Sequence, residues 1–276
     1  MKAVTQTDSG CGCGGMKFAP NLHFMYPEHP FRDRFAAARA DGFAAVEICF
    51  AYDVGLAEVR RALADAGQQL ISFNFPAGEL VQNVKRGVSC LPDHEAEFHA
   101  QIEEGLEWAT VLDCPRGIAP LSGNVPDGAD RDPYEDTYVS NLKVAAPLAE
   151  GAGVTLLVEP NNTQDQAGYF LRNLSEARHA VDAVASPNVR MLFDSYHTQI
   201  MEGNLVARFR AHRDVIDHVQ IGNVPGRHEP DHGEIDHRFL FSEMAASCYD
   251  GWIAGEYIPA GKTTAGLDWL DRWKLR

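Results

Sequence analysis

The sequence is short of positive charge and of long hydrophobic runs. Lysine and arginine total 24 against 39 aspartates and glutamates, which gives a formal net charge of −15. A chain this acidic lacks the basic surface with which proteins bind nucleic acids or anionic membranes. No uninterrupted apolar run approaches the roughly 18 residues that a membrane helix needs. We therefore expect neither a nucleic acid nor a membrane as a partner.

Cysteine is scarce for a chain of this size, with six in 276 residues. A domain of this length buries enough surface to be stable without disulfides, which favours a reducing compartment. The first fifteen residues, MKAVTQTDSGCGCGG, lack the apolar core of a signal peptide. We expect a flexible tail over residues 1–15, one domain over residues 16–276, and a cytoplasmic location.

The chain also lacks a dinucleotide-binding fingerprint, because no G-x-G-x-x-G follows its first apolar run. Instead, short apolar runs alternate with longer amphipathic segments. Strands are predicted at 16–22, 43–50, 69–75, 113–121, 154–159, 188–194, 215–222 and 250–257. Helices are predicted at 31–42, 55–67, 93–112, 134–153, 174–184, 204–213, 238–247 and 263–274. This alternation predicts an α/β fold, a single-domain (β/α)₈ TIM barrel, with a doubly wound open sheet as the alternative.

Polar oxygen-bearing residues lie near the C-terminal ends of the last four predicted strands. They are Glu159, Asp194, Gln220 and Glu256, each about one strand–helix repeat from the next. Taken singly, such a residue is usually a helix cap or a surface group, and Asp194 before Ser195 is well placed to be a cap. In a barrel, however, the C-terminal strand ends surround one mouth, where active sites lie. Four such residues in register indicate a functional site.

Three carboxylates around one mouth repel one another unless a positive charge lies between them. A ligand set made only of oxygen atoms suits Mg²⁺ or Mn²⁺ better than structural zinc. We therefore expect a divalent metal held by Glu159, Asp194, Gln220 and Glu256.

Further polar residues are predicted at the same end of the barrel. His197 follows Asp194 closely in 194-DSYH-197, and Arg227 and Glu229 lie in the loop 223-NVPGRHEPDHGEID-236. A histidine near the core and a polar loop are also common without any function. Arg227 is the best candidate for a substrate carboxylate, because its planar fork matches that group. His23, beside the first strand, is a weaker candidate of the same kind.

Several motifs at these residues carry a family resemblance, which runs from about Met16 to the C-terminus. The chain resembles hydroxypyruvate isomerases, within the xylose-isomerase-like TIM barrels. The resemblance implies that Glu159 and Glu256 are the catalytic acid/base pair and that the four oxygen ligands surround the metal. Related ketose 3-epimerases usually have histidine where this chain has Gln220, which favours the hydroxypyruvate branch. The motifs are 74-NFPAGE-79, 86-RGVSCLP-92, 159-EPNN-162, 194-DSYHTQ-199, 218-HVQIGNVPGRHEPDHGEI-235 and 255-GEYIPAG-261.

The reaction implied by the resemblance interconverts hydroxypyruvate and tartronate semialdehyde through an enediolate. His197, Arg227, His23 and Glu229 are then expected to bind the substrate, a small 2-oxo or hydroxy acid. A 2-oxo-tetronate isomerase or a ketose 3-epimerase could use the same site. A sugar-acid-binding barrel without activity and a metal-dependent endonuclease are alternatives from other classes. The sequence allows a homo-oligomer.

Overall fold

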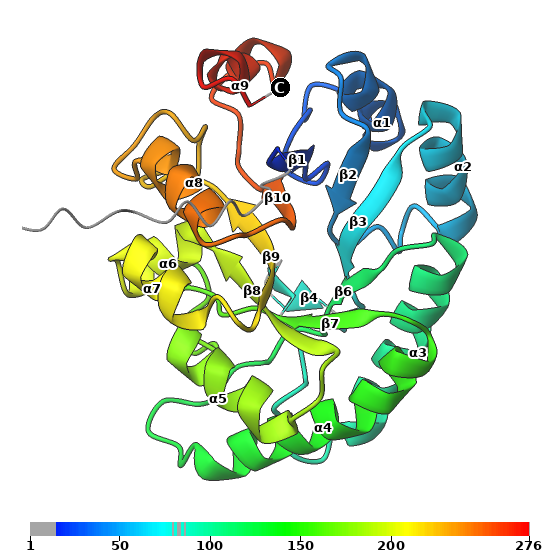
Figure 1. Cartoon of the computed structure of the whole chain (residues 1–276). Coiled ribbons are helices and arrows are strands. Elements are labelled where there is room, and N and C mark those ends of the chain that lie inside the picture. Colours follow the sequence, from blue (N-terminus) through cyan, green and yellow to red (C-terminus); the bar gives the residue numbers. More distant parts are fainter. Residues whose placement is uncertain (1–14, 79, 82–83, 86, 276) are drawn as a thin grey trace, which may run out of the picture.

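The computed structural model describes residues 15–275 except residues 79, 82, 83 and 86. The predicted tail therefore lies outside the described residues, apart from Gly15. Within the described part, eight parallel strands form one sheet (Figure 1). They are β1 (Lys17–Pro20), β2 (Ala45–Ile48), β3 (Gln69–Asn74), β6 (Arg116–Ile118), β7 (Thr155–Val158), β8 (Val189–Asp194), β9 (Ile216–Ile221) and β10 (Trp252–Gly255).

The sheet curls into a nearly closed barrel. Its strand order is β1-β10-β9-β8-β7-β6-β3-β2, so the first and last strands of the chain are neighbours. The remaining gap, between β1 and β2, is spanned by a parallel bridge between Asn21 and Glu47. There the backbone N–H of Leu22 donates to the carbonyl of Glu47 at 2.8 Å. The chain is therefore a TIM barrel, as the strand–helix alternation predicts.

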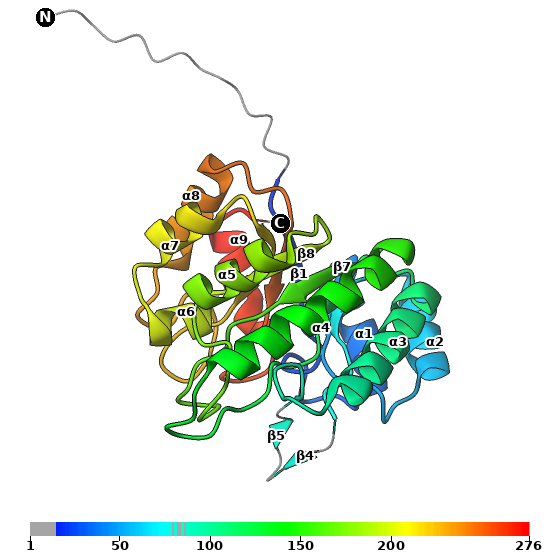
Figure 2. The ribbon, with the colours of Figure 1, turned by 90° about the horizontal axis from the view of Figure 1, so that it is seen from below.

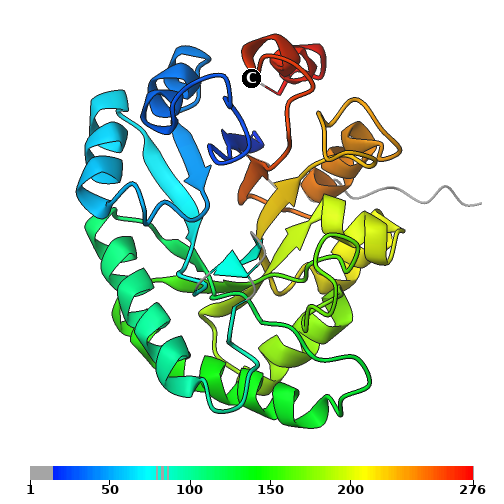
Figure 3. The ribbon, with the colours of Figure 1, turned by 180° about the vertical axis from the view of Figure 1, so that it is seen from behind.

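Helices surround the barrel in chain order, as the views along the barrel from opposite sides show (Figures 1 and 3). Their buried faces pack on the outer face of the strands and form the main apolar core. None of the helices in the described ranges is both long and apolar enough to cross a membrane. They are α1 (Phe31–Ala40), α2 (Leu56–Ala66), α3 (Glu95–Val111), α4 (Asp132–Gly151), α5 (Leu174–Val184), α6 (Ser195–Met201), α7 (Leu205–His212), α8 (His237–Ala246), the 3₁₀ turn η1 (Thr264–Leu267) and α9 (Asp268–Arg272).

Two features of the fold were not predicted from the sequence. The short helix α6 begins directly after β8, with the Asp194 carboxylate capping it by accepting from the N–H of Tyr196 at 2.7 Å. A hairpin of β4 (Leu80–Val81) and β5 (Val84–Lys85) interrupts the segment after β3. Figure 2 shows this hairpin projecting from one end of the barrel.

The barrel interior is layered, because alternate residues of a strand point to the same side. One layer is apolar and contains Ala19, Ala45 and Ile71 on one side and Ile118, Leu157 and Leu192 on the other. Two residues further along the chain, the same strands deliver polar groups, such as Glu47 after Ala45 and Asp194 after Leu192. The apolar layer closes the barrel below, and the polar residues face its C-terminal mouth.

Candidate active site

A chamber of about 580 Å³ opens at the C-terminal mouth of the barrel. This volume is in the range of small-molecule sites and exceeds what a very small acid fills. Residues from nearly every strand end contribute to it, as a barrel active site requires. The chamber is lined by His23, Phe24, Cys49, Phe50, Tyr52, Asp53, Asn74, Leu121, Glu159, Asn161, Asp165, Gln166, His197, Arg227 and Glu256.

Two glutamates in this chamber follow directly after strands, Glu159 after β7 and Glu256 after β10. Burial, together with the charges of Glu256 and Asp194, raises the pKa of Glu159 well above its ordinary value. Burial raises the pKa of Glu256 to about 8, although the positive charge of Arg227 opposes the shift. Two carboxyl groups this poorly solvated hold their protons at a pH where exposed glutamates have lost them. The pair can therefore exchange protons with a ligand near neutral pH.

Arg227 supplies positive charge between two of the predicted acidic ligands. Its Nη2 donates to Asp194 Oδ2 at 2.9 Å and also to a carboxylate oxygen of Glu256, while Nε donates to the Glu256 carbonyl at 3.1 Å. The guanidinium lies over the rings of Phe24 and Tyr196, 4.7 and 4.8 Å from their centroids. Although burial disfavours its charge, the surrounding carboxylates raise the pKa of Arg227 further. Arg227 therefore supplies part of the positive charge that we expected a metal ion to provide.

The backbone around Arg227 is arranged to bring the guanidinium into the chamber. Arg227 itself has φ +55, a left-handed conformation that a non-glycine residue adopts only under constraint. At Gly222, a β-carbon would lie 2.9 Å from Arg227 Cγ and 3.0 Å from the Glu256 carbonyl oxygen. A side chain at residue 222 would therefore displace the arginine.

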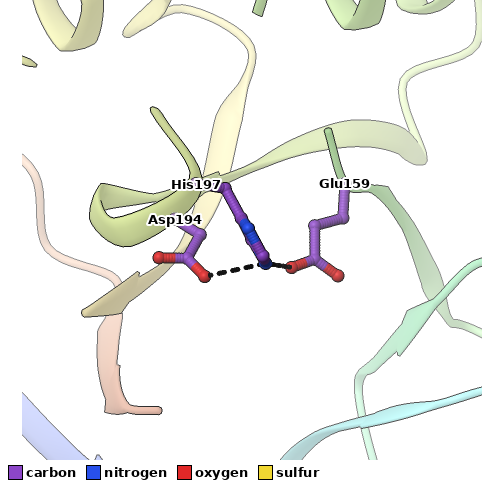
Figure 4. Close-up of side chains that lie close together, drawn as sticks. All are labelled: Glu159, Asp194 and His197. Carbon is purple, nitrogen blue, oxygen red and sulfur yellow. Dashed lines mark ion pairs between the residues drawn. The ribbon is translucent and has the colours of Figure 1, made fainter. Parts of the chain in front are cut away.

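His197 lies between two carboxylates, with its Nε2 3.5 Å from Asp194 and 3.8 Å from Glu159 (Figure 4). Its other ring nitrogen, Nδ1, is approached by the backbone N–H of Asn162 at 3.3 Å and by the Asn162 side chain at 2.7 Å. A backbone N–H can only donate, so Nδ1 accepts and the proton of the neutral ring is on Nε2. Burial lowers the pKa of His197 well below its ordinary value, so the ring stays neutral. His197 therefore offers a hydrogen-bond donor to the chamber.

Sequence reasoning missed Glu47, in the middle of the second strand. This carboxylate is fully buried and accepts from Asn21 Nδ2 at 2.8 Å, Gln220 Nε2 at 2.7 Å, His218 Nε2 at 2.6 Å, and the Ser72 hydroxyl. Burial opposes its ionisation, but the charge of His218 and these hydrogen bonds outweigh burial and lower the pKa of Glu47. Asn21 Nδ2 also donates to Glu256 Oε2 at 3.0 Å. One amide group thus links the buried anion to a candidate catalytic glutamate.

Of the other predicted residues, His23 lines the chamber and Glu229 does not. Both carboxylate oxygens of Glu229 accept from the backbone N–H of Ala260, at 3.0 and 3.2 Å, and the residue faces a separate surface hollow. Its carboxylate anchors the segment after β10, and its role in binding substrate stays a prediction. The signal for Glu47 was present in 43-FAAVEICF-50, where a charged residue interrupts an apolar strand.

The site offers donors that fit a small divalent cation. Ligand atoms of Glu159, Asp194 and His197 lie within 4.8 Å of one another. Gln220 is next to Asp194 in the sheet, and its Oε1 is buried without a hydrogen-bond partner among the described residues. Because Nε2 of Gln220 is committed to Glu47, the amide presents its oxygen as a free ligand. His197 fits less well, since its Nε2 carries the proton and has no lone pair for a metal.

Buried carboxyl groups, an arginine and candidate metal ligands meet at the C-terminal mouth of this TIM barrel. Such an arrangement is typical of enzymes that move protons on small polar substrates. The family model of xylose isomerase-like TIM barrels matches residues 35–273. The chain belongs to this family and is an isomerase.

Curated relatives support this assignment over nearly the whole chain. A protein of Cupriavidus necator named 2-oxo-tetronate isomerase is 44% identical over 254 residues, which cover 92% of this chain and 97% of the relative. The hydroxypyruvate isomerase of Escherichia coli is 34% identical over 259 residues, which cover 94% and 100%. A crystal structure of a protein from Brucella melitensis, named AP endonuclease, family 2, matches with a TM-score of 0.89 and 38% identity, covering 93% and 98%.

Proposed function

We propose that this isomerase interconverts a small 2-oxo-3-hydroxy acid and its 3-oxo isomer. Hydroxypyruvate and tartronate semialdehyde are the shortest such pair, and 2-oxo-tetronate is one hydroxymethyl group longer. The observation that carries the proposal is the pair of buried glutamates, Glu159 and Glu256, which face one chamber beside Arg227. They follow β7 and β10, so the substrate lies between strands that are not neighbours in the sheet.

The reaction needs one proton to leave C3 and one to arrive at C2. An ionised glutamate takes the C3 proton, and the electron pair of that bond forms the enediolate. A protonated glutamate gives a proton to C2, and the hydroxyl proton at O3 passes to O2, so atoms and charges balance. Raised pKa values suit this exchange, because acid and base strengths near the working pH favour proton transfer.

In this scheme Arg227 binds the substrate and His197 stabilises the negative charge of the enediolate. The arginine forms ion pairs with the site's carboxylates through Nη2 and would bind the carboxylate of the substrate through Nη1. The Nε2–H of His197 would donate to the oxygen on which negative charge develops, and Asn162 fixes that tautomer. A donor placed in advance at this point stabilises the enediolate.

A divalent metal, Mg²⁺ or Mn²⁺, fits the oxygen donors of Glu159, Asp194, Gln220 and Glu256. When bound, such an ion supplies Lewis-acid stabilisation of negative oxygen. Asp194 and Glu256 already contact Arg227. We therefore infer that metal and guanidinium share these carboxylates, and that Gln220 contributes the free amide oxygen.

The first test is to incubate the purified protein with hydroxypyruvate and with 2-oxo-tetronate in D₂O, with and without EDTA, and to follow both by proton NMR. We expect the 3-oxo isomer to form, with deuterium entering at carbon. Glu159→Gln and Glu256→Gln should each lower turnover by about 10²–10⁴-fold with an unchanged circular dichroism spectrum. Near-normal turnover by Glu256→Gln would contradict the two-glutamate scheme.

A second candidate, phosphodiester cleavage in DNA, arises from the name of the Brucella protein. The net charge of −15 argues against it, because phosphate binding depends on lysine and arginine. Solved ketose 3-epimerases, such as the D-allulose 3-epimerase from Methylomonas sp., are 18% identical with a TM-score of 0.73 and show the shared fold alone. We therefore propose a small-molecule substrate.

A further inference from the structure

Asn74 presents an unused polar group to the chamber. It is the last residue of β3, its exposed fraction is 6%, and it lines the chamber. Its Oδ1 is buried and has no hydrogen-bond partner within the part of the chain that the structure describes. Leaving a buried polar atom unpaired is destabilising, so native proteins rarely keep one without a reason.

The backbone of Asn74 is held firmly, so the amide is placed in advance. Tyr52 Oη donates to the Asn74 carbonyl at 3.0 Å, and the Tyr52 ring packs against Trp108 at a tilt of 53°, with centroids 4.5 Å apart. Asn74 also pairs with Ile118 of β6 in the sheet. None of these contacts uses the side-chain amide.

A second unpaired oxygen lies on a different wall of the same chamber. Gln166, in the segment between β7 and α5, donates through Nε2 to Asn161 Oδ1 at 3.0 Å. That bond fixes the orientation of the amide, and Oε1 is left buried without a partner in the described ranges. Two amide oxygens of the chamber lining can therefore accept a hydrogen bond from a ligand.

Strand order places Asn74 across the barrel from Arg227. In the sheet, β3 is four strands from β9, which puts it on the far side of an eight-stranded ring. Asp194 and Gln220 belong to β8 and β9, Arg227 follows β9, and Glu256 follows β10. A substrate whose carboxylate meets Arg227 thus extends its other end toward β3.

We propose that Asn74, assisted by Gln166, binds a hydroxyl group on the part of the substrate beyond the reacting carbons. This inference rests on the proposed function and deepens it. A hydroxyl both donates and accepts, so it suits the Asn74 amide in either orientation, whereas a carboxylate has no hydrogen to give to an amide oxygen. Hydroxypyruvate ends at its reacting C3 and has no such group. The preferred substrate is therefore a 2-oxo acid of at least four carbons that carries a C4 hydroxyl.

The first experiment compares kcat/KM for 2-oxo-tetronate and hydroxypyruvate in the wild type and in Asn74→Ala. The matched control is Gln69→Ala, an exposed amide at the opposite end of the same strand. We expect Asn74→Ala to lower kcat/KM for the four-carbon acid by about tenfold or more, and for hydroxypyruvate by less than about threefold. The control should change neither. An equal loss for both acids, or no loss, would overturn the proposal.

A second experiment separates this proposal from the proposed function. Calorimetry measures binding of unreactive acids: glycerate, which has three carbons, and erythronate and threonate, which have four. The wild type should bind one of the four-carbon acids about tenfold more tightly than glycerate, and Asn74→Ala should remove the difference. If neither 2-oxo acid is turned over, the proposed function fails, and these affinities still decide the Asn74 subsite. Equal affinities in the wild type would refute it.

Discussion

Glu47 is a charged residue whose partners come from across the barrel. Asn21 lies beyond β1, Ser72 on β3, and His218 and Gln220 on β9, so one carboxylate of β2 connects these three strands. Removing a buried charge partner leaves the others unsatisfied, which is more damaging than losing an exposed ion pair. The same carboxylate fixes the orientation of the Gln220 amide. It also accepts from Asn21 Nδ2, which donates to Glu256 as well.

Glu47→Ala is therefore expected to lower the free energy of unfolding by about 3–5 kcal/mol, measured by urea denaturation. The matched control is Glu58→Ala, which removes a carboxylate from an ion pair with the largely exposed Arg61 and should change stability by less than about 1 kcal/mol. A loss at residue 47 no larger than at residue 58 would show that the buried network does not stabilise the barrel.

The pH dependence of activity is a second prediction at this scale. Glu256, with a pKa raised to about 8, and Glu159, whose pKa is raised well above its ordinary value, both keep their protons through the ordinary glutamate range, so the pair gains a base only at higher pH. In EDTA, kcat/KM should rise with pH toward about 8. Added Mg²⁺ or Mn²⁺ should move this rise to lower pH, because a cation favours ionised carboxylates. A profile that is flat from pH 5 to 8 under both conditions would contradict this assignment.

At the scale of elements, the loop between β9 and α8 determines where Arg227 lies. His237 opens α8, and its Nδ1 is 3.0 Å from the carbonyl of Pro230 in this loop, while Nε2 is 3.0 Å from the Ser195 hydroxyl on α6. A carbonyl only accepts, so Nδ1 donates and Nε2 accepts from Ser195. Both nitrogens of the neutral ring are used, and a protonated ring would have to reverse the hydrogen bond with Ser195.

Burial lowers the pKa of His237 to about 4 from an ordinary value of 6.5. The unfolded chain thus binds the proton more readily, and stability falls as the pH drops from 6.5 toward 4. Between pH 7 and pH 5, the wild type should lose about 2 kcal/mol more of its unfolding free energy than His237→Gln. Urea denaturation of both proteins at the two pH values measures this difference. Equal losses would show that His237 does not titrate as inferred.

Much of the element order could be predicted from sequence because apolar runs and helical patterns alternate regularly. The strand containing Gly117 was the weakest prediction, since proline and glycine surround it. The structure gives a reason: a β-carbon at Gly117 would lie 2.0 Å from the ring of Phe75, and one at Gly105 would lie 2.3 Å from it. Packing of that ring requires the glycines. Helix α6 escaped prediction because it begins at Ser195 without an intervening loop.

For the site, polar residues at or after the ends of the later strands were predicted, whereas Glu47 on β2 and Asn74 on β3 were not. Glu159, His197, Arg227 and Glu256 all line one chamber, because strand ends in a barrel converge. Glu47 and Asn74 could not be selected, since their roles depend on which side chains of distant strands face them. The position of Glu229 outside the chamber could not be predicted, because the path of a long loop is not encoded in local patterns.

At the scale of the whole molecule, the C-terminal segment packs against β1 and α8. Trp269 is 2% exposed, and its ring meets Phe18 of β1 edge to face at a centroid distance of 5.5 Å. It also lies 6.2 Å from the ring of Phe241 on α8. The hydroxyl of Thr263 accepts from the backbone N–H of Tyr26 at 2.6 Å, which attaches this segment to the loop after β1.

Trp269→Ala should therefore lower the free energy of unfolding by about 3–5 kcal/mol, because it opens a cavity at this junction. The control is Phe239→Ala, an aromatic truncation on the surface of α8, where the side chain is 55% exposed. That change should cost less than about 0.5 kcal/mol. Similar losses in the two variants, measured by urea denaturation, would mean that the C-terminal segment is not part of the cooperative core.

The adjacency of β1 and β10 also has a consequence for protein synthesis. The ribosome makes β1 first and β10 last among the eight strands, yet these two strands pair with each other. A nascent chain that stops before Trp252 can form at most an open sheet of seven strands, whose edges on β1 and β9 expose unpaired backbone groups. It also lacks Glu256. We therefore expect such truncated products to aggregate, and the synthesis of β10 to be the step that both lets the ring close and brings Glu256 to the chamber.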